Sequence, residues 1–394
     1  MESVKEFMKK LLSLIVAVTV SAALTGCYFH VSNSSGWSFS SLRAATNLVQ
    51  SAEIPAGLKT LDVINAFGEI HITGADNVPA AWSQKLTVRA RTDAVVQEIA
   101  SNFICKAELD GDRLKLIVTA PNSFAPHSFR SDLEITVPKS VAVQTHNQYG
   151  RTDISGISGD VEAASKFGAM ELRDIGGKVR AETSYAALKI SGTGPATLQN
   201  QFGSIEAIGI RGPLDAATSY ASLDARDISG TVKIRNQFGR VHVEKAGEAD
   251  LKTSYAELRA KEINGDARLV NQFGRVAAEA ITGSVKAETS YGPMDITGSG
   301  ANFVCDNQFG GIKLQATSAT LASLEARTSY AALEVRLPAA LKPAVQAHTS
   351  YGDIESDFPV LMKSRSQDSL SDQPPGTPRI NLHNQNGKIR VVGE

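Results

Sequence analysis

The side chains that could do chemistry in this chain are mainly carboxylates. Two carboxylates held near one sugar linkage supply the acid and the base that cut a polysaccharide. One row of aspartates recurs, each directly before an isoleucine: Asp153, Asp174, Asp227 and Asp295. Because each begins a turn sequence such as Asp-Ile-Ser-Gly, and because the row is spread along the chain, we expect solvated turn residues. A polysaccharide lyase or hydrolase remains the alternative function.

Other motifs of catalysis and ligand binding are missing from the sequence. It contains no CxxC, HExxH, GxSxG or glycine-rich phosphate loop, and its turns lack the paired glycines of calcium-binding solenoids. The histidines have no ligand spacing, so each is expected to be an isolated surface side chain. They are His30, His71, His127, His146, His242, His348 and His383. We expect no catalytic residue, no metal and no cofactor.

Composition narrows the class of protein. The 394 residues include 40 basic and 41 acidic side chains, a net charge of −1, without a basic stripe, so no nucleic-acid partner is expected. A hydrophobic content of 42% is enough for a substantial core. Many Ala, Val, Ile, Thr and Ser residues between glycine turns indicate short strands.

The N-terminus predicts export. An apolar run of 14 residues, Leu11 to Leu24, follows three lysines and is shorter than the roughly 20 residues of a membrane span. The sequence Leu-Thr-Gly-Cys that ends at Cys27 resembles the lipobox of bacterial lipoproteins. By that resemblance, residues 1–26 are a signal peptide and Cys27 carries lipid that anchors the protein to a bacterial membrane. The Ser- and Asn-rich composition that follows predicts a tether over 27–45. Tyr28 is not the Asp linked to inner-membrane retention, so the resemblance favours the outer membrane, facing periplasm or cell surface.

The two other cysteines, Cys105 and Cys305, allow one disulfide in an oxidising compartment. Each falls on the same side of the alternating strand pattern as its apolar neighbours, which is the expected inward side. A free cysteine packs there as a small hydrophobe. We therefore favour two buried, unpaired thiols over a disulfide.

Two short sequence motifs, which we call words, recur through the rest of the chain. Asn-Gln-Phe-Gly occurs four times, and Thr-Ser-Tyr occurs between its copies, so that an aromatic recurs every 17 or 18 residues from Tyr149 to Phe309. A glycine precedes nearly every aromatic by eight residues, which gives the order turn, strand, corner, strand. Such a period predicts an all-β fold, a parallel β-helix or β-solenoid.

The words themselves are expected to form a structural ladder, because equivalent residues of stacked coils lie about 4.8 Å apart. Strand parity places the Asn or Thr and the aromatic on the inside, as hydrogen-bonded polar and stacked rows. An exposed aromatic platform for carbohydrate is the alternative. Outward glutamines form the most regular polar row: Gln201, Gln237, Gln272 and Gln308. The ladder comprises Asn200, Phe202, Asn236, Phe238, Asn271, Phe273, Asn307, Phe309, Thr183, Tyr185, Thr218, Tyr220, Thr253, Tyr255, Thr289 and Tyr291.

The size of one coil is open between 18 residues and 35–36 residues. The longer coil, with two corners and 18-residue half-repeats, would stack each word on itself. It would also place charges of alternating sign in one ladder. That ladder is Lys189, Asp224, Arg259 and Asp295. We predict the longer coil, and a right-handed one by analogy with parallel crossovers.

The remaining segments complete the layout. Residues 46–140 hold a first β-unit and a capping insertion, with a strand at 85–91, a helix near 94–103 and a hairpin turning at Asp110-Gly111. The repeats occupy 141–361, a polar loop 362–379, and a closing strand pair 380–394, where Asn-Gln-Asn-Gly echoes the first word without its aromatic.

A family resemblance follows from these segments. The strand pair LDVINAFGEIHITG, the block VPKSVAVQTHNQYGRTDISG, the repeated corners and the closing INLHNQNGKIRVV resemble bacterial β-strand-repeat proteins of unknown function described as adhesin-like, including the adhesin-like head domain group. The resemblance covers about 55–394 and implies a parallel β-helix on an exported or membrane-attached protein. It implies no catalytic residue. The expected function is a non-enzymatic lipoprotein of the cell envelope, adhesive or scaffolding, that binds a glycan, an envelope polymer or an envelope protein.

Overall fold

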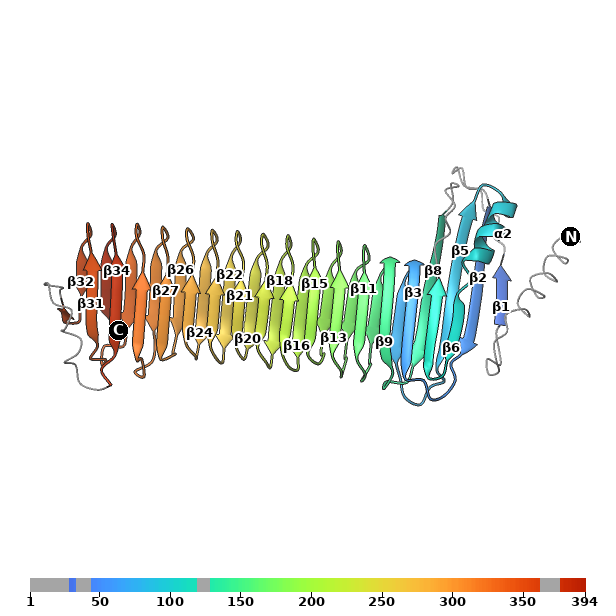
Figure 1. Ribbon diagram of the computed structural model, residues 1–394, viewed down its shortest axis with the longest axis horizontal. Helices are drawn as coiled ribbons and strands as arrows, with labels where there is room; N and C mark the ends of the chain where they lie inside the picture. Colours follow the sequence, from blue (N-terminus) through green and yellow to red (C-terminus); the bar gives the residue numbers. More distant parts are fainter. Residues whose placement is uncertain (1–27, 33–43, 119–127, 362–375) are drawn as a thin grey trace, which may run out of the picture. The chain divides into compact units, whose positions relative to one another are not determined.

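The protein is all-β and divides into two compact units, residues 1–159 and 160–394. The computed structural model describes residues 28–32, 44–118, 128–361 and 376–394. Within these ranges the only helix is α2 (Asp93–Asn102), and all other regular elements are strands (Figure 1). The expected signal peptide 1–26, the lipidation site Cys27 and most of the polar loop 362–379 lie outside the described residues.

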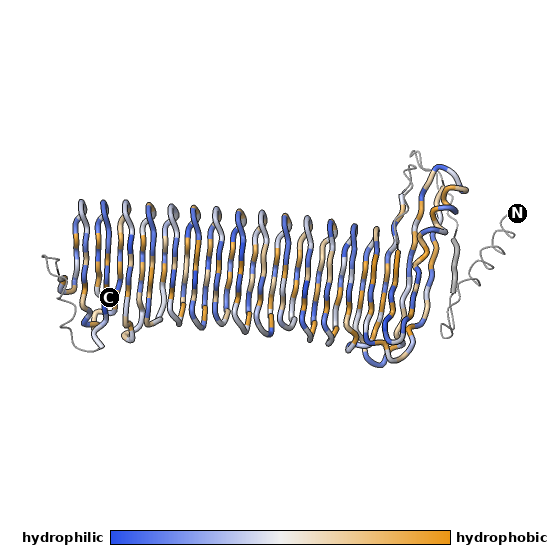
Figure 2. The backbone as a smooth tube through the Cα atoms, viewed as in Figure 1, coloured by the Kyte–Doolittle hydropathy of each residue, from blue (hydrophilic) through white to orange (hydrophobic). Residues whose placement is uncertain are grey.

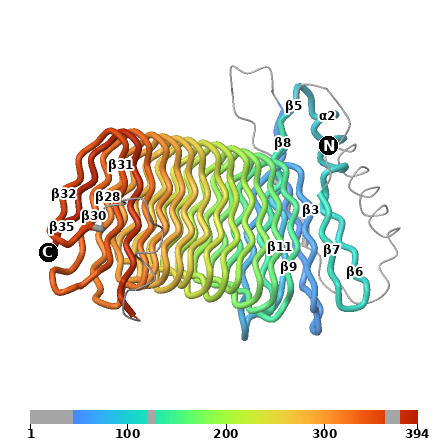
Figure 3. The backbone as a smooth tube through the Cα atoms, turned by 60° about the vertical axis from the view of Figure 1, so that its left-hand side comes forward, coloured from blue at the N-terminus to red at the C-terminus, as the bar shows by residue number. Residues whose placement is uncertain are grey.

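Unit 2 is a stack of coils, each made of two short strands joined by a tight corner (Figure 3). Strands of successive coils pair in parallel and in register, with Val161 opposite Val179 and Val179 opposite Ala196. One coil therefore takes 17 or 18 residues as far as β28 (Ile312–Ala316), and the next one takes 21. The β-solenoid is confirmed, and the predicted coil of 35–36 residues is wrong. The right-handed sense stays a prediction.

The predicted ladder of alternating charges does not form, because its members lie two coils apart. Lys189 pairs in register with Glu206, which pairs in turn with Asp224, so Lys189 and Asp224 are two coils apart. The Lys189 ammonium lies 3.0 Å from the Glu206 carboxylate, its neighbour on the next coil. Lys189 therefore pairs with a charge one coil away and not with the one two coils away.

Two sheets run the length of unit 2. We call one the groove sheet, for the groove described below, and the other the ion-pair sheet. The groove sheet contains β11 (Val161–Ser165), β13 (Val179–Thr183), β15 (Ala196–Asn200), β17 (Leu214–Ala217), β19 (Val232–Arg235), β21 (Ala249–Lys252), β23 (Ala267–Val270), β25 (Val285–Glu288), β27 (Asn302–Asp306), β29 (Ser323–Arg327), β34 (Arg379–Asn384), β31 (Ala344–Thr349) and β33 (Val360–Leu361). The ion-pair sheet contains β12 (Met170–Arg173), β14 (Leu188–Ser191), β16 (Ile205–Ile210), β18 (Leu223–Ile228), β20 (Val241–Ala246), β22 (Leu258–Ile263), β24 (Val276–Ile281), β26 (Met294–Gly298), β28 (Ile312–Ala316), β30 (Leu333–Leu337), β35 (Ile389–Gly393) and β32 (Ile354–Ser356).

Apolar side chains of both sheets fill the space between them. Val232 and Ile234 of β19 are fully buried, whereas Lys233 and Arg235 between and after them face outward. The same alternation of apolar and polar residues runs along the strands of each coil (Figure 2). Burial of such rows supplies the main stabilising free energy of a solenoid.

The last coils of unit 2 are stacked out of chain order. The strand β34 pairs with β29 on one side and with β31 on the other, and β35 likewise lies between β30 and β32. The C-terminal strand pair is therefore inserted between two coils that precede it in the sequence. At the corners this order places Asn386 between Tyr330 and Tyr351, so a Thr-Ser-Tyr corner, an Asn-Gln corner and a Thr-Ser-Tyr corner follow one another in space.

Unit 1 combines two solenoid-like coils with a capping region. One sheet has the order β6 (Lys106–Asp110), β7 (Arg113–Val118), β3 (Thr60–Phe67), β9 (Ala142–Tyr149). The other has the order β1 (Tyr28–Ser32), β2 (Ala44–Glu53), β5 (Ala81–Ala90), β8 (Ser128–Val137), β4 (Ile70–Gly74), β10 (Thr152–Ser155).

The insertion of unit 1 separates two neighbouring coils in the sequence but not in space. Phe67 and Tyr149 are paired in register, and their rings stack at 4.6 Å. The expected helix, strand and hairpin of the insertion are present as α2, β5 and β6–β7. The expected tether is corrected in one place, because Tyr28–Ser32 is a strand that pairs antiparallel with β2. Residues 33–43 lie outside the described part.

A row of left-handed residues bends the strands of the ion-pair sheet. Ile208 pairs with Arg226 and Ile210 with Ile228, so Gly209 and Asp227 lie opposite each other at a kink that both strands share. The residues at this kink share φ values between 54° and 67°: Asp174, Gly192, Gly209, Asp227, Lys245, Glu262 and Ala280. Between β24 and β26 the register also shifts next to Ala280, which makes that kink a bulge. A side chain in this region costs about 1–2 kcal/mol.

Replacing Ala280 by glycine should raise the free energy of unfolding by about 1 kcal/mol, since glycine adopts the left-handed region without penalty. The matched control is Ala277→Gly, on the same strand at an extended position, which should lower stability by about 0.5–1 kcal/mol. Urea unfolding of both variants measures the difference. Equal effects of the two substitutions would contradict the role of the bulge.

The two thiols are buried and unpaired, as predicted. Burial raises the pKa of Cys105 and of Cys305 to about 12. At pH 8 the folded protein should therefore present almost no thiolate, and iodoacetamide should leave both cysteines unmodified over hours. In urea, where the thiols return to an ordinary pKa, both should react within minutes. Mass spectrometry of the alkylated protein reads out the result, and fast labelling without denaturant would show that the thiols are accessible.

Candidate binding groove

The corners of unit 2 lock each coil to the one before it. The side-chain amide of Asn236 donates from Nδ2 to the carbonyl of Ala221 at 2.9 Å, and its Oδ1 accepts from the backbone N–H of Gln237 at 2.7 Å. The asparagine is 8% exposed. Corresponding bonds to the preceding corner are made by Asn200, Asn271, Asn307 and Asn384.

Threonine does the same on the alternate coils. The Thr218 hydroxyl donates from Oγ1 to the carbonyl of Gly203 at 3.2 Å. Thr253, Thr328 and Thr349 donate to the equivalent glycine carbonyls, whereas Thr289 donates to the carbonyl of Gln272. The buried Asn and Thr therefore satisfy corner carbonyls that would otherwise lack partners.

Glycine in the first word is required by close approach between coils. A Cβ at Gly239 would lie 1.8 Å from the carbonyl oxygen of Ala221, and one at Gly203 would lie 2.0 Å from that of Ala186. Neither distance is compatible with a side chain. The glycine thus lets the corner of one coil rest directly on the carbonyl of the coil before it.

The aromatic rings stand outside the core. From Phe167 to Tyr330 the rings of successive coils stack with centroids 4.8–5.1 Å apart and planes within 14° of parallel. Phe238 is 40% exposed and Tyr220 is 53% exposed. The inward position predicted for the rings is wrong, because β19 ends at Arg235 and strand parity does not extend through the corner to Phe238.

Stacking removes the ring faces from reach of a ligand. A sugar that binds an aromatic side chain needs an open ring face, and here each face within the row is covered by the next ring. The row exposes ring edges and tyrosine hydroxyls. It therefore stabilises the corner and does not provide the stacking platform for carbohydrate that was the alternative.

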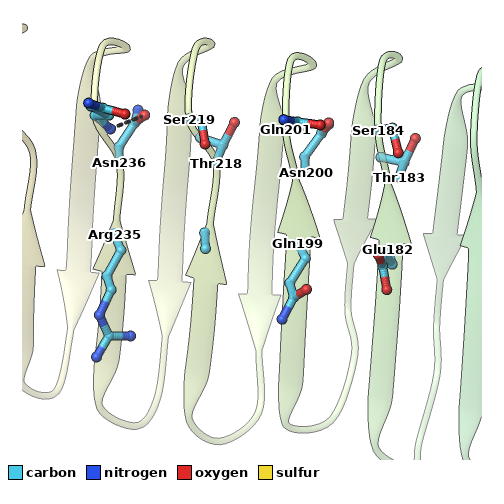
Figure 4. A pocket seen from close by; sticks show the side chains of 12 residues that line it. Glu182, Thr183, Ser184, Gln199, Asn200, Gln201, Thr218, Ser219, Arg235 and Asn236 are labelled. Atoms are coloured by element: carbon cyan, nitrogen blue, oxygen red, sulfur yellow. Dashed lines mark hydrogen bonds between the residues drawn. The ribbon is translucent and has the colours of Figure 1, made fainter.

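A shallow groove runs beside the rings on the groove sheet. One wall is the corner row, in which exposed Gln and half-buried Ser alternate from coil to coil, and the floor is made of outward strand residues (Figure 4). One stretch has a volume of about 400 Å³ and is lined by Ser184, Gln201, Ser219 and Gln237 on the wall and by Glu182, Gln199, Ala217 and Arg235 on the floor. A second stretch has Ser254, Gln272, Ser290 and Gln308 on the wall.

On the opposite face, formed by the ion-pair sheet, charged side chains form ion pairs with one another. Lys261 lies 3.0 Å from Glu244, and Arg275 lies 2.8 Å from Asp295. The hydrogen bond from Lys261 holds the pKa of Glu244 below its usual value. Charged groups that are paired in this way must be separated before they bind a ligand.

The aspartates that suggested an enzyme do not form a site. Asp174 and Asp227 are left-handed residues of the kink row, three coils apart. Asp295 lies on β26 and is paired with Arg275, and Asp153 belongs to unit 1, where Arg151 donates to it at 2.7 Å. No group of three or more His, Cys, Asp or Glu residues with metal-binding geometry occurs in the described ranges. No helix there has the length and apolarity to cross a bilayer.

One pair of residues was missed by sequence reasoning. His348 and His383 are 35 positions apart and were expected to be isolated, yet their rings stack at 5.2 Å because β34 lies beside β31. The echo of Asn-Gln-Phe-Gly at 384–387 was the signal that could have placed them, since it marks a coil and each histidine directly precedes a corner Asn or Thr.

No family model matches the chain, and no curated protein matches it. Three solved structures match over most of its length. They are a candidate cell adhesion protein from Clostridium sporogenes ATCC 15579 (9% identity, 94% of this chain and 100% of that one, TM-score 0.16), a candidate adhesin from Bacteroides fragilis NCTC 9343 (13%, 88% and 97%, 0.15) and a candidate adhesin from Parabacteroides distasonis ATCC 8503 (8%, 87% and 97%, 0.21). All three are described as the class of protein that the sequence resembles. With scores this low, nothing about a ligand of this chain follows from them.

The corner bonds predict opposite effects for one substitution at two coils. The Thr183 hydroxyl is buried without a partner in the described part, whereas the carbonyl of Gly168 before it accepts from Ser165. Thr183→Val should therefore raise the free energy of unfolding by up to about 1 kcal/mol, and Thr218→Val should lower it by about 1 kcal/mol. Thermal or urea unfolding gives both values, and a loss of stability at both sites would mean that Thr183 does have a partner.

Proposed function

We propose that this chain is a non-enzymatic, adhesin-like protein of the bacterial cell envelope, and that unit 2 binds an extended glycan along the groove. Cys27 carries the lipid anchor in this proposal, on an exported protein whose repeats face the periplasm or the cell surface. The lipobox resemblance supports the anchor, and the groove supports the binding role.

The observation that carries the proposal is the uniform row of Gln201, Gln237, Gln272 and Gln308. All four side chains are exposed, and their amide groups make no hydrogen bond to any residue in the described ranges. They therefore have no visible part in holding the coils together. An identical, unused donor and acceptor on alternate coils is what repeated recognition of a polymer requires.

Recent duplication of the coils does not explain this uniformity. The floor positions two residues before these glutamines, at the ends of the preceding strands, are Gln199, Arg235, Val270 and Asp306. These positions have diverged in charge and size, whereas the glutamines beside them have not. A constraint that acts on the wall and not on the floor fits a ligand that contacts the wall.

The spacing favours a glycan over a peptide. The glutamines recur on every second coil, about 9.6 Å apart, whereas one face of an extended peptide presents a side chain every two residues, about 6.6 Å apart, and would lose register within a few coils. A single pyranose unit of an extended chain spans close to one coil. Hydroxyl and amide groups on the wall are matched donors and acceptors for sugar hydroxyls.

The test is binding of the purified protein to a glycan array and to polysaccharides extracted from the envelope. Replacing Gln201, Gln237, Gln272 and Gln308 by alanine removes up to four hydrogen bonds and should weaken binding by about tenfold or more. The control is Lys189→Ala with Glu206→Ala, a neutral pair on the ion-pair sheet, which should bind as the parent protein does.

Three outcomes would overturn the proposal. Binding that is equally weakened by the control pair would place the ligand elsewhere, and retention of proteins but no glycan would replace the ligand class. Release of new reducing ends from a polysaccharide would show that the protein is a polysaccharide-degrading enzyme, which is the alternative function.

A further inference from the structure

The C-terminal end of the groove sheet holds a second pocket with a different composition. It is formed where β34 is inserted between β29 and β31, so three strands that are not consecutive in the chain contribute to it. At its outer row Arg327, His383 and His348 are paired in register. The pocket exists only because the coils are stacked out of chain order.

The two histidines in this pocket are placed as a pair. Both are exposed on the outer face of the groove sheet, on adjacent parallel strands. Their ring centroids are 5.2 Å apart and their planes differ by 15°. Each imidazole ring has two nitrogens, so one nitrogen of each ring can face a common point while the other keeps a further partner.

We propose that His348 and His383 together bind a divalent transition metal ion. Imidazole nitrogen is a ligand for Cu²⁺, Ni²⁺ and Zn²⁺, and a site of this kind follows the order in which Cu²⁺ binds most tightly. Water completes the coordination, because the pocket is open to solvent. This site is separate from the glycan groove proposed above and does not depend on it.

The charged side chains that the described strands β29, β34 and β31 place beside the pocket do not oppose a cation. Arg327, next to His383 in the row, forms an ion pair with Glu325 and lies 3.8 Å from the carboxylate of Asp306. Two carboxylates thus offset the one guanidinium. The positions opposite Glu325 on the next two strands are the neutral Asn381 and Gln346.

Metal binding would fasten the end of the solenoid. One histidine is on the inserted coil and the other on the coil that covers it, so a bound ion links the two across the seam. Because the unfolded chain does not hold the histidines together, an ion that binds only the folded state raises its stability by mass action.

The experiment uses the full chain without a polyhistidine tag, titrated with Cu²⁺ and with Ni²⁺ by calorimetry. We expect one ion of each metal at this site, and a loss of affinity of about tenfold or more in His348→Gln and in His383→Gln. The matched control is His146→Gln, an exposed histidine of unit 1, which should leave the affinity unchanged. Circular dichroism without metal checks that each variant is folded.

Two further measurements make the result specific to a pair. The electron paramagnetic resonance spectrum of bound Cu²⁺ should show two coordinated nitrogens in the parent protein and fewer in either single variant. Ni²⁺ should raise the unfolding temperature of the parent protein and not that of the double variant. Unchanged affinity in both single variants, or an equal loss in His146→Gln, would overturn the proposal.

Discussion

The corners of unit 2 depend on the hydrogen bond that a buried Asn or Thr side chain donates, on most coils, to a carbonyl of the coil before it. The strands are four to six residues long in most coils, too short for a single strand pair to be stable alone. Asn236 and Thr218 bond across the seam between coils, at the point where the backbone turns and its carbonyls leave the sheet. The corner bond therefore adds order where the regular ladder ends, and Gly239 makes the approach close enough for it.

The two words alternate in the spatial order of the coils, although not in their order along the sequence. Tyr330 and Tyr351 belong to two successive Thr-Ser-Tyr words in the sequence, which breaks the alternation on paper. In space the Asn384 coil lies between them, and its side chain donates to Ala331 while Thr349 donates to Gly387. The inserted coil thus makes the same bonds as any other, which explains why the C-terminal strand pair fits between two coils that precede it.

The sequence predicted the solenoid, the buried Asn and Thr and the insertion of unit 1, because each has a local signal in periodicity or parity. It did not predict the coil length, because the alternation of inward and outward residues along one strand does not determine which strand pairs with it. The repeated identical motifs suggested that each motif stacks on a copy of itself. Asn236 instead needs a corner carbonyl on the neighbouring coil to accept its hydrogen bond, and that of Ala221, next to the Thr-Ser-Tyr motif, accepts it. The rings were misplaced because the parity argument was carried past the end of β19. The His348 and His383 pair was beyond reach because it depends on the order of coils at the C-terminal end.

A closed interior also decides how such a protein can bind. Trp82, Phe103 and Phe303 are buried, and the space between the sheets of each unit is filled by side chains, so a ligand has to be held on the surface. A single amide or hydroxyl in contact with water contributes little net free energy to binding. Repetition changes this, because a polymer that has made one contact meets the next at high effective concentration. The regular coil that gives unit 2 its stability therefore also gives a weak contact its only route to useful affinity, which is to occur many times in register along one ligand.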